Sequence, residues 1–282
     1  MWQYFNETPL VRLERLSDSF HLQLYGKIEI MNPTGSHKDR ESIMVVSDAI
    51  KQGFSEVGCA STGNAAISIS AYAYISGLKC DIYVSKNMNS EKMALIKMFK
   101  PNIHVIEGDY SEAIEVSNRD FKEKEVYNAN PGQCSAKLRG NAEIGKEIAQ
   151  QISPNYVICP TNNGTHFTGV WTGLKEAGKK PRMIAATAQK TEIADSIQGF
   201  HRIEGKTFDE ALNESNGIIV DVSDDEIIQA LRMLYKEGIV AEPASAASIA
   251  TIQHLEYDKD EIVCCTITGS GLKFPKLIEK II

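Results

Sequence analysis

The chain has 282 residues, of which 43% are hydrophobic and 24% are charged, a composition typical of a globular protein with a sizeable core. Its formal net charge of −7 is spread along the sequence without a cluster of Lys or Arg, which argues against nucleic acid or anionic lipid as a partner. The N-terminus lacks the pattern of a signal peptide, and no stretch approaches the roughly 18 apolar residues of a membrane span. We therefore expect a soluble cytoplasmic protein that acts on a small molecule.

The predicted secondary structure alternates between strands and helices along the chain. Apolar runs rich in Val and Ile predict strands at residues 27–31, 56–60, 80–84, 103–106, 156–159, 183–188, 217–220 and 262–267. Segments of helical period predict helices at residues 64–76, 90–99, 136–151 and 224–237. This alternation predicts an α/β fold of mainly parallel sheet flanked by helices, and it leaves open whether there are one or two sheets.

The six cysteines form no CxxC pair and have no histidine at zinc-ligand spacing. Several of them lie within apolar runs such as residues 262–265. We therefore expect reduced cysteines in the core and no metal site.

A lysine follows the first predicted strand and a run of turn-forming residues, at the start of a helical stretch. This residue is Lys38, within the sequence NPTGSHKDR of residues 32–40. The positive end of a helix dipole disfavours a charged amine and so helps supply the neutral amine that Schiff-base chemistry needs. A solvated loop lysine is the alternative, and His37 is more typical of a packing residue than of a base.

Two further loops join a strand to a helix with small and polar residues. Residues 60–66 combine hydroxyl side chains with free backbone amides, which suits a carboxylate or phosphate, although Ser61 or Asn64 would equally cap the helix. Residues 159–166 suit a phosphate at a helix N-terminus. Val170 and Trp171 stand where a P-loop requires Lys and Ser or Thr, and the GxGxxG pattern is absent, so this second loop indicates phosphate without a nucleotide.

A fourth segment, residues 266–273, ends the last strong strand with the sequence TITGSGLK. The hydroxyl of Thr268, followed by two glycines, suits a heteroaromatic nitrogen approached closely by backbone, and a plain turn is the alternative. Four such loops agree with the placement of ligands at the carboxyl ends of strands in open α/β sheets.

Together these motifs resemble those of the fold-type II, tryptophan-synthase-β-like enzymes that depend on pyridoxal 5'-phosphate (PLP), and among them the threonine synthases most closely. Three further segments match in the same order: residues 8–13, 128–131 and 242–248. The resemblance implies two open, mainly parallel twisted sheets with PLP in the cleft between two domains. It assigns residues 1–40 and 136–282 to a large PLP-binding domain and residues 41–135 to a small domain that closes over substrate, in a homodimer.

The resemblance also implies a role for each matched residue. Lys38 would form the Schiff base with PLP and then move protons at the α-carbon of the substrate. Asn64 would bind the ring hydroxyl, and the substrate carboxylate would be held by Ser61, Thr62 and Asn64. The cofactor phosphate would be bound by Thr161, Asn162, Asn163, Gly164 and Thr165. Thr268 would meet the pyridine nitrogen, and a hydroxyl there suits elimination and replacement better than transamination.

The chain departs from the threonine synthase pattern at three positions. His37 replaces an aromatic residue, Glu41 replaces a glycine, and Gln133 stands where an arginine would bind the substrate phosphate. We therefore expect β- or γ-elimination or replacement on a small amino acid, either by a threonine synthase or by a related enzyme that does not use O-phosphohomoserine efficiently. Cysteine-synthase-like β-replacement and serine or threonine dehydration are alternatives. A non-catalytic binding protein of the same fold is a further alternative, against which the retention of Lys38 argues.

Overall fold

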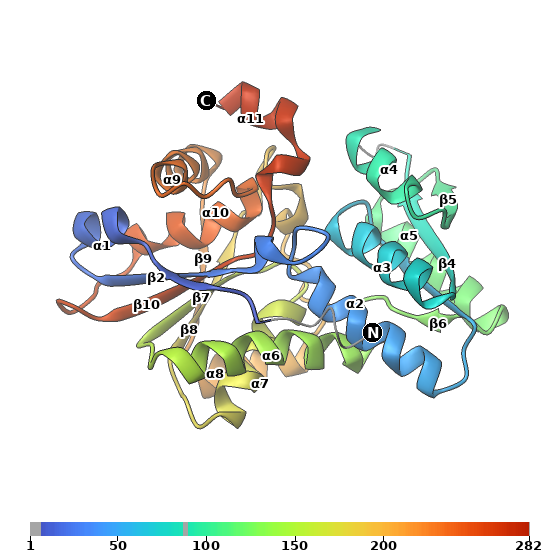
Figure 1. Ribbon diagram of the computed structural model, residues 1–282, viewed down its shortest axis with the longest axis horizontal. Helices are drawn as coiled ribbons and strands as arrows, with labels where there is room; N and C mark the ends of the chain where they lie inside the picture. The colour runs from blue at the N-terminus through green and yellow to red at the C-terminus, as the bar shows by residue number, and fades with distance from the viewer. Residues whose placement is uncertain (1–6, 87–89, 282) are drawn as a thin grey trace. The chain divides into compact units, whose positions relative to one another are not determined.

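The computed structural model describes residues 7–86 and 90–281, which divide into two compact units (Figure 1). Unit 1 comprises residues 36–86 and 90–140, and unit 2 comprises residues 7–35 and 141–281. The expected roles of the two domains stay a prediction: a large domain of residues 1–40 and 136–282 that binds PLP, and a small domain of residues 41–135 that closes over substrate.

Unit 2 is built on a six-stranded sheet in the described part of the chain. Its strands are β1 (Leu10–Arg12), β2 (Gln23–Ile28), β7 (Tyr156–Pro160), β8 (Arg182–Thr187), β9 (Ile218–Asp221) and β10 (Ile262–Ile267). Their order is β1-β2-β10-β7-β8-β9, with β1 antiparallel to β2 and the other pairs parallel. Its helices are α1 (Glu14–Phe20), α7 (Thr165–Glu176), α8 (Lys206–Glu214), α9 (Asp224–Lys236), α10 (Pro243–Ala250) and α11 (Pro275–Ile281).

Helices cover both faces of this sheet. α1, α9 and α10 pack on one face, and α7 and α8 pack on the other together with the second half of α6 (Ser135–Gln151), whose first residues belong to unit 1 (Figure 1). The central strands β7 and β10 are therefore apolar and buried along nearly their whole length.

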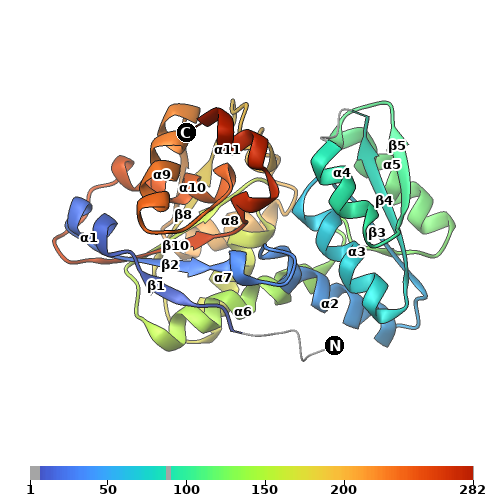
Figure 2. The same cartoon turned by 45° about the horizontal axis from the view of Figure 1, so that its top comes forward.

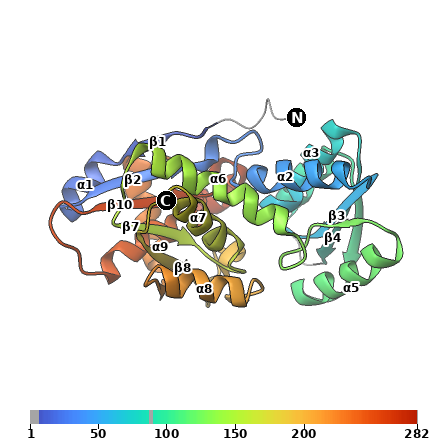
Figure 3. The ribbon, with the colours of Figure 1, turned by 90° about the horizontal axis from the view of Figure 1, so that it is seen from below.

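Unit 1 is a smaller α/β layer structure with a parallel sheet of order β5-β4-β3-β6 in its described residues. The strands are β3 (Glu56–Ala60), β4 (Lys79–Ser85), β5 (Asn102–Ile106) and β6 (Tyr127–Asn128). The helices α2 (Lys38–Lys51), α3 (Asn64–Ser76) and α4 (Ser90–Lys97) pack on one face, and α5 (Tyr110–Glu123) packs on the other (Figures 2 and 3).

These two sheets confirm the predicted α/β class and its mainly parallel strands. All six cysteines are buried free thiols. Among the described residues, none of the helices combines the length and the apolar character that a membrane span requires.

The predicted strand at residues 27–31 is wrong, because β2 ends at Ile28 and Glu29–Met31 forms a 3-10 turn. The buried carboxylate of Glu29 explains the turn. It accepts hydrogen bonds from Thr8 Oγ1 at 2.5 Å and from Asn32 Nδ2 at 2.7 Å, and these bonds fold the chain away from the sheet. A contact with Thr8 cannot be seen in the local apolar pattern.

In unit 1, the backbones of α6 and α2 approach closely at Gly140. A Cβ atom at this position would overlap the carbonyl oxygen of Arg40 and lie 2.9 Å from Glu41 Cα, so only glycine fits without a shift of backbone. Lys137 lies three residues before Gly140 on the same side of α6. The crossing therefore brings Lys137 towards Glu41.

We predict that Gly140→Ala destabilises the protein even though alanine is the better helix former. Overpacking of backbone against backbone costs about 1–3 kcal/mol, which chemical denaturation measures as a lower free energy of unfolding. Gln150→Ala, on an exposed position of α6, is the matched control and is expected to stay within about 0.5 kcal/mol of wild type. Equal stability of the two variants would show that the helices do not cross this closely.

Candidate functional site

Lys38 is the first residue of α2, directly after His37 as the N-cap residue. Its Nζ lies 2.5 Å from Oε1 of Glu41, one helical turn further along. The Glu41 side chain is only 2% exposed and that of Lys38 is 18% exposed, so the pair is largely shielded from water. Asp39 and Glu41 in the first turn also complement the helix dipole.

A second lysine contacts the same carboxylate. Lys137, near the start of α6, places its Nζ 3.8 Å from Oε2 of Glu41, and its side chain is 8% exposed. Two ammonium groups and one carboxylate thus share a buried region of unit 1. Sequence reasoning noted Glu41 as a departure from the related enzymes, but it could not pair Glu41 with a residue on another helix.

Cys59 and Tyr110 lie within electrostatic range of this cluster. Burial raises the pKa of the Cys59 thiol to about 11, with the charge of Lys137 as the main opposing influence. Burial also raises the pKa of Tyr110, and the negative charge of Glu41 adds to that shift. At neutral pH both groups are therefore neutral, and the charges of the cluster belong to the lysines and Glu41.

The loop between β3 and α3 contains the predicted carboxylate-binding residues Ser61, Thr62 and Asn64. The N-cap of α3 is Gly63, and no side chain of the described residues caps this helix. Ser61 Oγ instead accepts a hydrogen bond from the Gly63 amide at 3.2 Å. Neither Ser61 nor Asn64 is therefore a helix cap, and the first-turn amides of α3 remain suited to an anion.

Asn130 fixes the end of β3 in front of this loop. Its Oδ1 accepts from the Ala60 amide at 2.7 Å, and its Nδ2 donates to Ser117 Oγ and to Asn118 Oδ1, both at 2.8 Å. The matched motif at residues 128–131 thus braces the strand end from which the loop leaves.

Gln133 follows this motif and has an exposed side chain. Its backbone amide donates to the carbonyl of Asn130 at 3.2 Å, so the residue belongs to a turn that leads into α6. Lys137, four residues later, is buried and lies beside Glu41, the residue whose carboxylate pairs with Lys38.

In unit 2, the predicted phosphate loop joins β7 to α7. Gly164 is the N-cap residue with φ 92°, and a Cβ atom there would lie 3.1 Å from Phe208, so the position favours glycine twice over. Asn163 Oδ1 accepts from the Thr165 amide at 3.1 Å. Thr161 and Thr165 are buried at the two ends of the loop.

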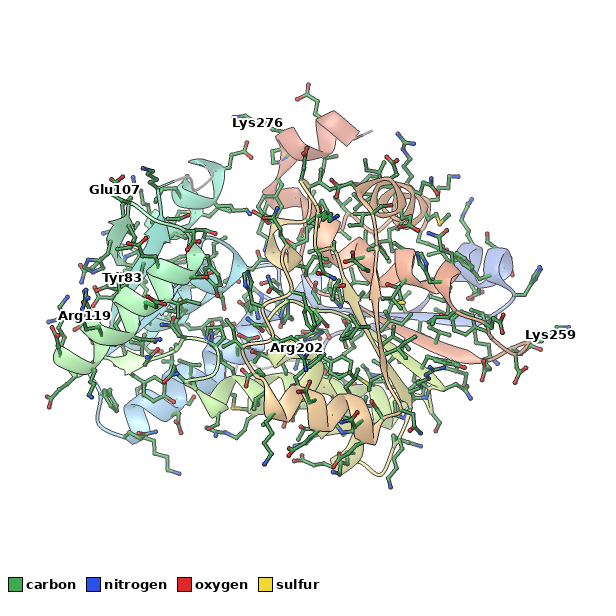
Figure 4. The ribbon with its side chains drawn as sticks, turned by 180° about the vertical axis from the view of Figure 1, so that it is seen from behind. Tyr83, Glu107, Arg119, Arg202, Lys259 and Lys276 are labelled. Carbon is green, nitrogen blue, oxygen red and sulfur yellow. The ribbon has the colours of Figure 1, made fainter. Side chains whose placement is uncertain are left out.

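The segment before α8 braces this loop. The side-chain amide of Asn162 donates to the carbonyls of Ser196 and Gln198, each at 3.1 Å, so both N–H groups of that amide are used within the protein. The backbone amide of Arg202, a residue labelled in Figure 4, donates to the Asn162 carbonyl at 3.3 Å. The Arg202 guanidinium pairs with Asp209. Asn162 therefore holds the loop in shape.

Glu204, from the same segment, places a carboxylate on the loop. Its Oε1 accepts a hydrogen bond from Thr165 Oγ1 at 2.8 Å, and its amide donates to the Asn163 carbonyl at 2.9 Å. Sequence reasoning missed this residue, because 39 positions separate it from Thr165.

Thr268 leaves β10 at the sheet edge where Thr161 leaves β7. The two strands are parallel neighbours, with Cys265 opposite Ile158, so the two loops start side by side. Thr268 Oγ1 lies 3.0 Å from the hydroxyl of Ser245, which also accepts from the Gly269 amide at 2.7 Å. Two hydroxyl groups therefore meet at Thr268, and the buried carboxylate of Glu242 lies beside the next residue, Gly269.

The comparisons with known proteins agree with this arrangement. The profile of a family described as "Pyridoxal-phosphate dependent enzyme" matches residues 1–269. The threonine synthase of Halalkalibacterium halodurans is 33% identical over 296 residues, which cover 95% of this chain and 83% of that protein. The threonine synthase of Bacillus sp. (strain ULM1) is 35% identical over 299 residues, which cover 96% and 84%.

Solved structures share the fold at lower identity. The processed form of threonine deaminase isoform 2 from Solanum lycopersicum has a TM-score of 0.84 at 21% identity and covers 98% of this chain and 82% of that one. Cysteine synthase from Entamoeba histolytica has a TM-score of 0.85 at 20% identity and covers 98% and 89%. As the motifs at residues 32–40, 60–66, 159–166 and 266–273 predicted, the chain belongs to the family of fold-type II enzymes whose cofactor is pyridoxal 5'-phosphate.

Proposed function

We propose that this enzyme catalyses β- or γ-elimination or replacement on a small amino acid, in the manner of its threonine synthase relatives, and that its substrate is not O-phosphohomoserine. The observation that carries the second part is the charge balance at Lys38, where Glu41 neutralises the buried cation Lys137. The expected homodimer and cytoplasmic location stay predictions.

The side chains present fit the cofactor. PLP needs a primary amine for its aldehyde, a cradle for its phosphate and a partner for its ring nitrogen. Lys38 offers a largely buried amine, and the nearby hydroxyl of Ser36 is fully buried without a hydrogen-bond partner among the described residues. Gly164 and the first turn of α7 form an anion cradle, and Thr268 offers a buried hydroxyl.

In this proposal, Lys38 binds the cofactor and then removes or returns the proton at the α-carbon of the substrate. PLP, when bound, makes that proton acidic by withdrawing electrons from the α-carbon. The loop of Thr161, Asn162, Asn163, Gly164 and Thr165 holds the phosphate, with Asn162 acting as a brace. Asn64 binds the ring hydroxyl of the cofactor, and Thr268 binds its ring nitrogen. Ser61, Thr62 and Asn64 together bind the carboxylate of the substrate.

A phosphorylated substrate requires further positive charge. A phosphate monoester dianion that leaves water must regain charge-assisted hydrogen bonds, which arginine usually supplies. Gln133 supplies only a neutral amide. Lys86 pairs with Glu107, which is labelled in Figure 4, and Arg139 pairs with Asp48. Both cationic side chains are 52% exposed, so neither is a buried charge that could replace the arginine.

Lys137 is a buried cation of unit 1, as are Arg40 and Lys92, and its ammonium nitrogen lies 3.8 Å from the carboxylate of Glu41. Each charge-assisted hydrogen bond is worth about 1.5–3 kcal/mol against about 1 kcal/mol for a neutral one. A missing bidentate contact then lowers kcat/KM for a phosphorylated substrate by roughly tenfold to several hundredfold. An unmodified or O-acylated hydroxy amino acid avoids this requirement.

We predict that purified enzyme processes serine, threonine, O-acetylserine or O-acetylhomoserine in preference to O-phosphohomoserine and O-phosphoserine. Spectral change and product release would be followed for each compound under the same conditions. When it is run with and without added sulfide as the replacing nucleophile, this panel also separates cysteine-synthase-like replacement from dehydration. Efficient release of threonine from O-phosphohomoserine would refute the proposal.

We predict that Lys38→Ala abolishes turnover and leaves folding intact, because it removes the amine without removing core packing. Borohydride treatment followed by intact-mass measurement should show one PLP-sized adduct on wild type and none on the variant. Lys273→Ala is the control, since Lys273 donates to the carbonyl of Gly35 at 3.1 Å and its variant should keep the adduct. An adduct on Lys137 in the Lys38→Ala variant would contradict the assignment of Lys38.

We predict that Glu204→Gln strengthens PLP binding at pH 8 by about threefold to tenfold, because a carboxylate on Thr165 repels the phosphate dianion. Glutamine keeps an oxygen acceptor for Thr165 and removes only the charge. Glu210→Gln is the control, as Glu210 pairs with Lys206 on the surface of α8. Absorbance titration with PLP measures both affinities. Equal affinities in the two variants would show that the Glu204 carboxylate does not oppose the phosphate.

A further inference from the structure

The most unusual group of charges in unit 1 is the pair of lysines that shares Glu41. Lys38 Nζ lies 2.5 Å from one carboxylate oxygen, and Lys137 Nζ lies 3.8 Å from the other. All three side chains are less than one-fifth exposed, so water screens their interactions only weakly. With both lysines protonated, the three side chains carry a net charge of +1.

A lysine that attacks a carbonyl must first lose its proton, and a carboxylate alone opposes this loss. Glu41 on its own would favour the ammonium form of Lys38. If Lys38 became neutral, a buried carboxylate would lose one of its cations, which is strongly unfavourable when no other charge balances it. Lys137 changes this balance, because the neutral form of Lys38 leaves Glu41 and Lys137 as a matched pair.

Other titratable and charged groups lie near the cluster, among them the fully buried Arg40, which precedes Glu41 on α2. His37, on α2, has its Nε2 3.8 Å from the Glu41 oxygen that binds Lys38. Cys59 on β3 and Tyr110 on α5 are neutral at physiological pH because burial raises the pKa of each.

We propose that Glu41 and Lys137 are positioning residues that set the charge of Lys38. Glu41 holds the amino group in place, and Lys137 supplies the positive charge that balances Glu41 whenever Lys38 is neutral. The inference rests on the proposed role of Lys38 as the residue that binds PLP.

The test measures how pH controls the capture of PLP by the full-length protein. PLP is removed with hydroxylamine and added back between pH 6 and pH 10, and the growth of visible absorbance gives the capture rate. Borohydride trapping and peptide mass spectrometry then locate the adduct. The variants are Glu41→Gln, Lys137→Met and the double variant, with Lys137→Arg as the control that keeps the positive charge.

Removal of one charge at this distance should move the midpoint of the pH profile by about one unit. In Lys137→Met, Glu41 remains and favours the ammonium form, so the midpoint should rise. In Glu41→Gln, Lys137 remains and disfavours the ammonium form, so the midpoint should fall. The double variant should lie between the two single variants, and Lys137→Arg should match wild type.

A common midpoint in all variants, with only the rate constant changed, would overturn the inference and leave the two residues a structural role. Circular dichroism of each variant checks that the fold is retained, and Lys137→Arg separates the effect of charge from that of packing. Failure of wild type to capture PLP on Lys38 would instead refute the proposed function. The two failures therefore give different results.

Discussion

The charge arrangement around Lys38 depends on the close crossing of α6 and α2 at Gly140. Without a side chain at this position, the backbone of α6 lies against Arg40 and Glu41. Lys137, one turn earlier on α6, consequently reaches the carboxylate that also binds Lys38. The glycine thus allows the close helix crossing that brings Lys137 to the carboxylate beside Lys38.

The chemistry expected at Lys38 follows from this arrangement. When two lysines share one buried carboxylate, one lysine can lose its proton while the other remains as the cationic partner of the carboxylate. In the same arrangement Lys137 is paired with Glu41, so its positive charge is not available to the phosphate of a phosphorylated substrate. In the proposed function, substrate choice and the availability of the Lys38 amine both follow from this local balance of charge.

The sequence predicted the parts of the site that depend on local pattern. Loops at the carboxyl ends of β3, β7 and β10 are each a strand followed by small and polar residues, and such patterns are visible in a window of ten residues. The family was also predicted correctly from these loops. The four motifs therefore carried most of the information on the fold and cofactor.

The contacts that tune the site could not be predicted in this way. Glu41 and Lys137 are brought together by packing of two helices, and Glu204 reaches Thr165 from a segment 39 residues away. The turn at Glu29 depends likewise on Thr8, which is 21 residues away. A count along the sequence pointed to Gln133 as the residue that faces a substrate phosphate, whereas Gln133 is exposed and Lys137, four residues later, is buried.

The most direct measurement is a crystal structure of the PLP-loaded enzyme, with attention to the partners of Glu41. The account predicts that Lys38 is joined to the cofactor and that the Lys137 ammonium lies within hydrogen-bonding distance of the Glu41 carboxylate. A Lys137 side chain turned away from Glu41 and towards a bound phosphate or sulfate would contradict it. In that case Lys137 would serve the substrate, and the charge balance described here would not exist.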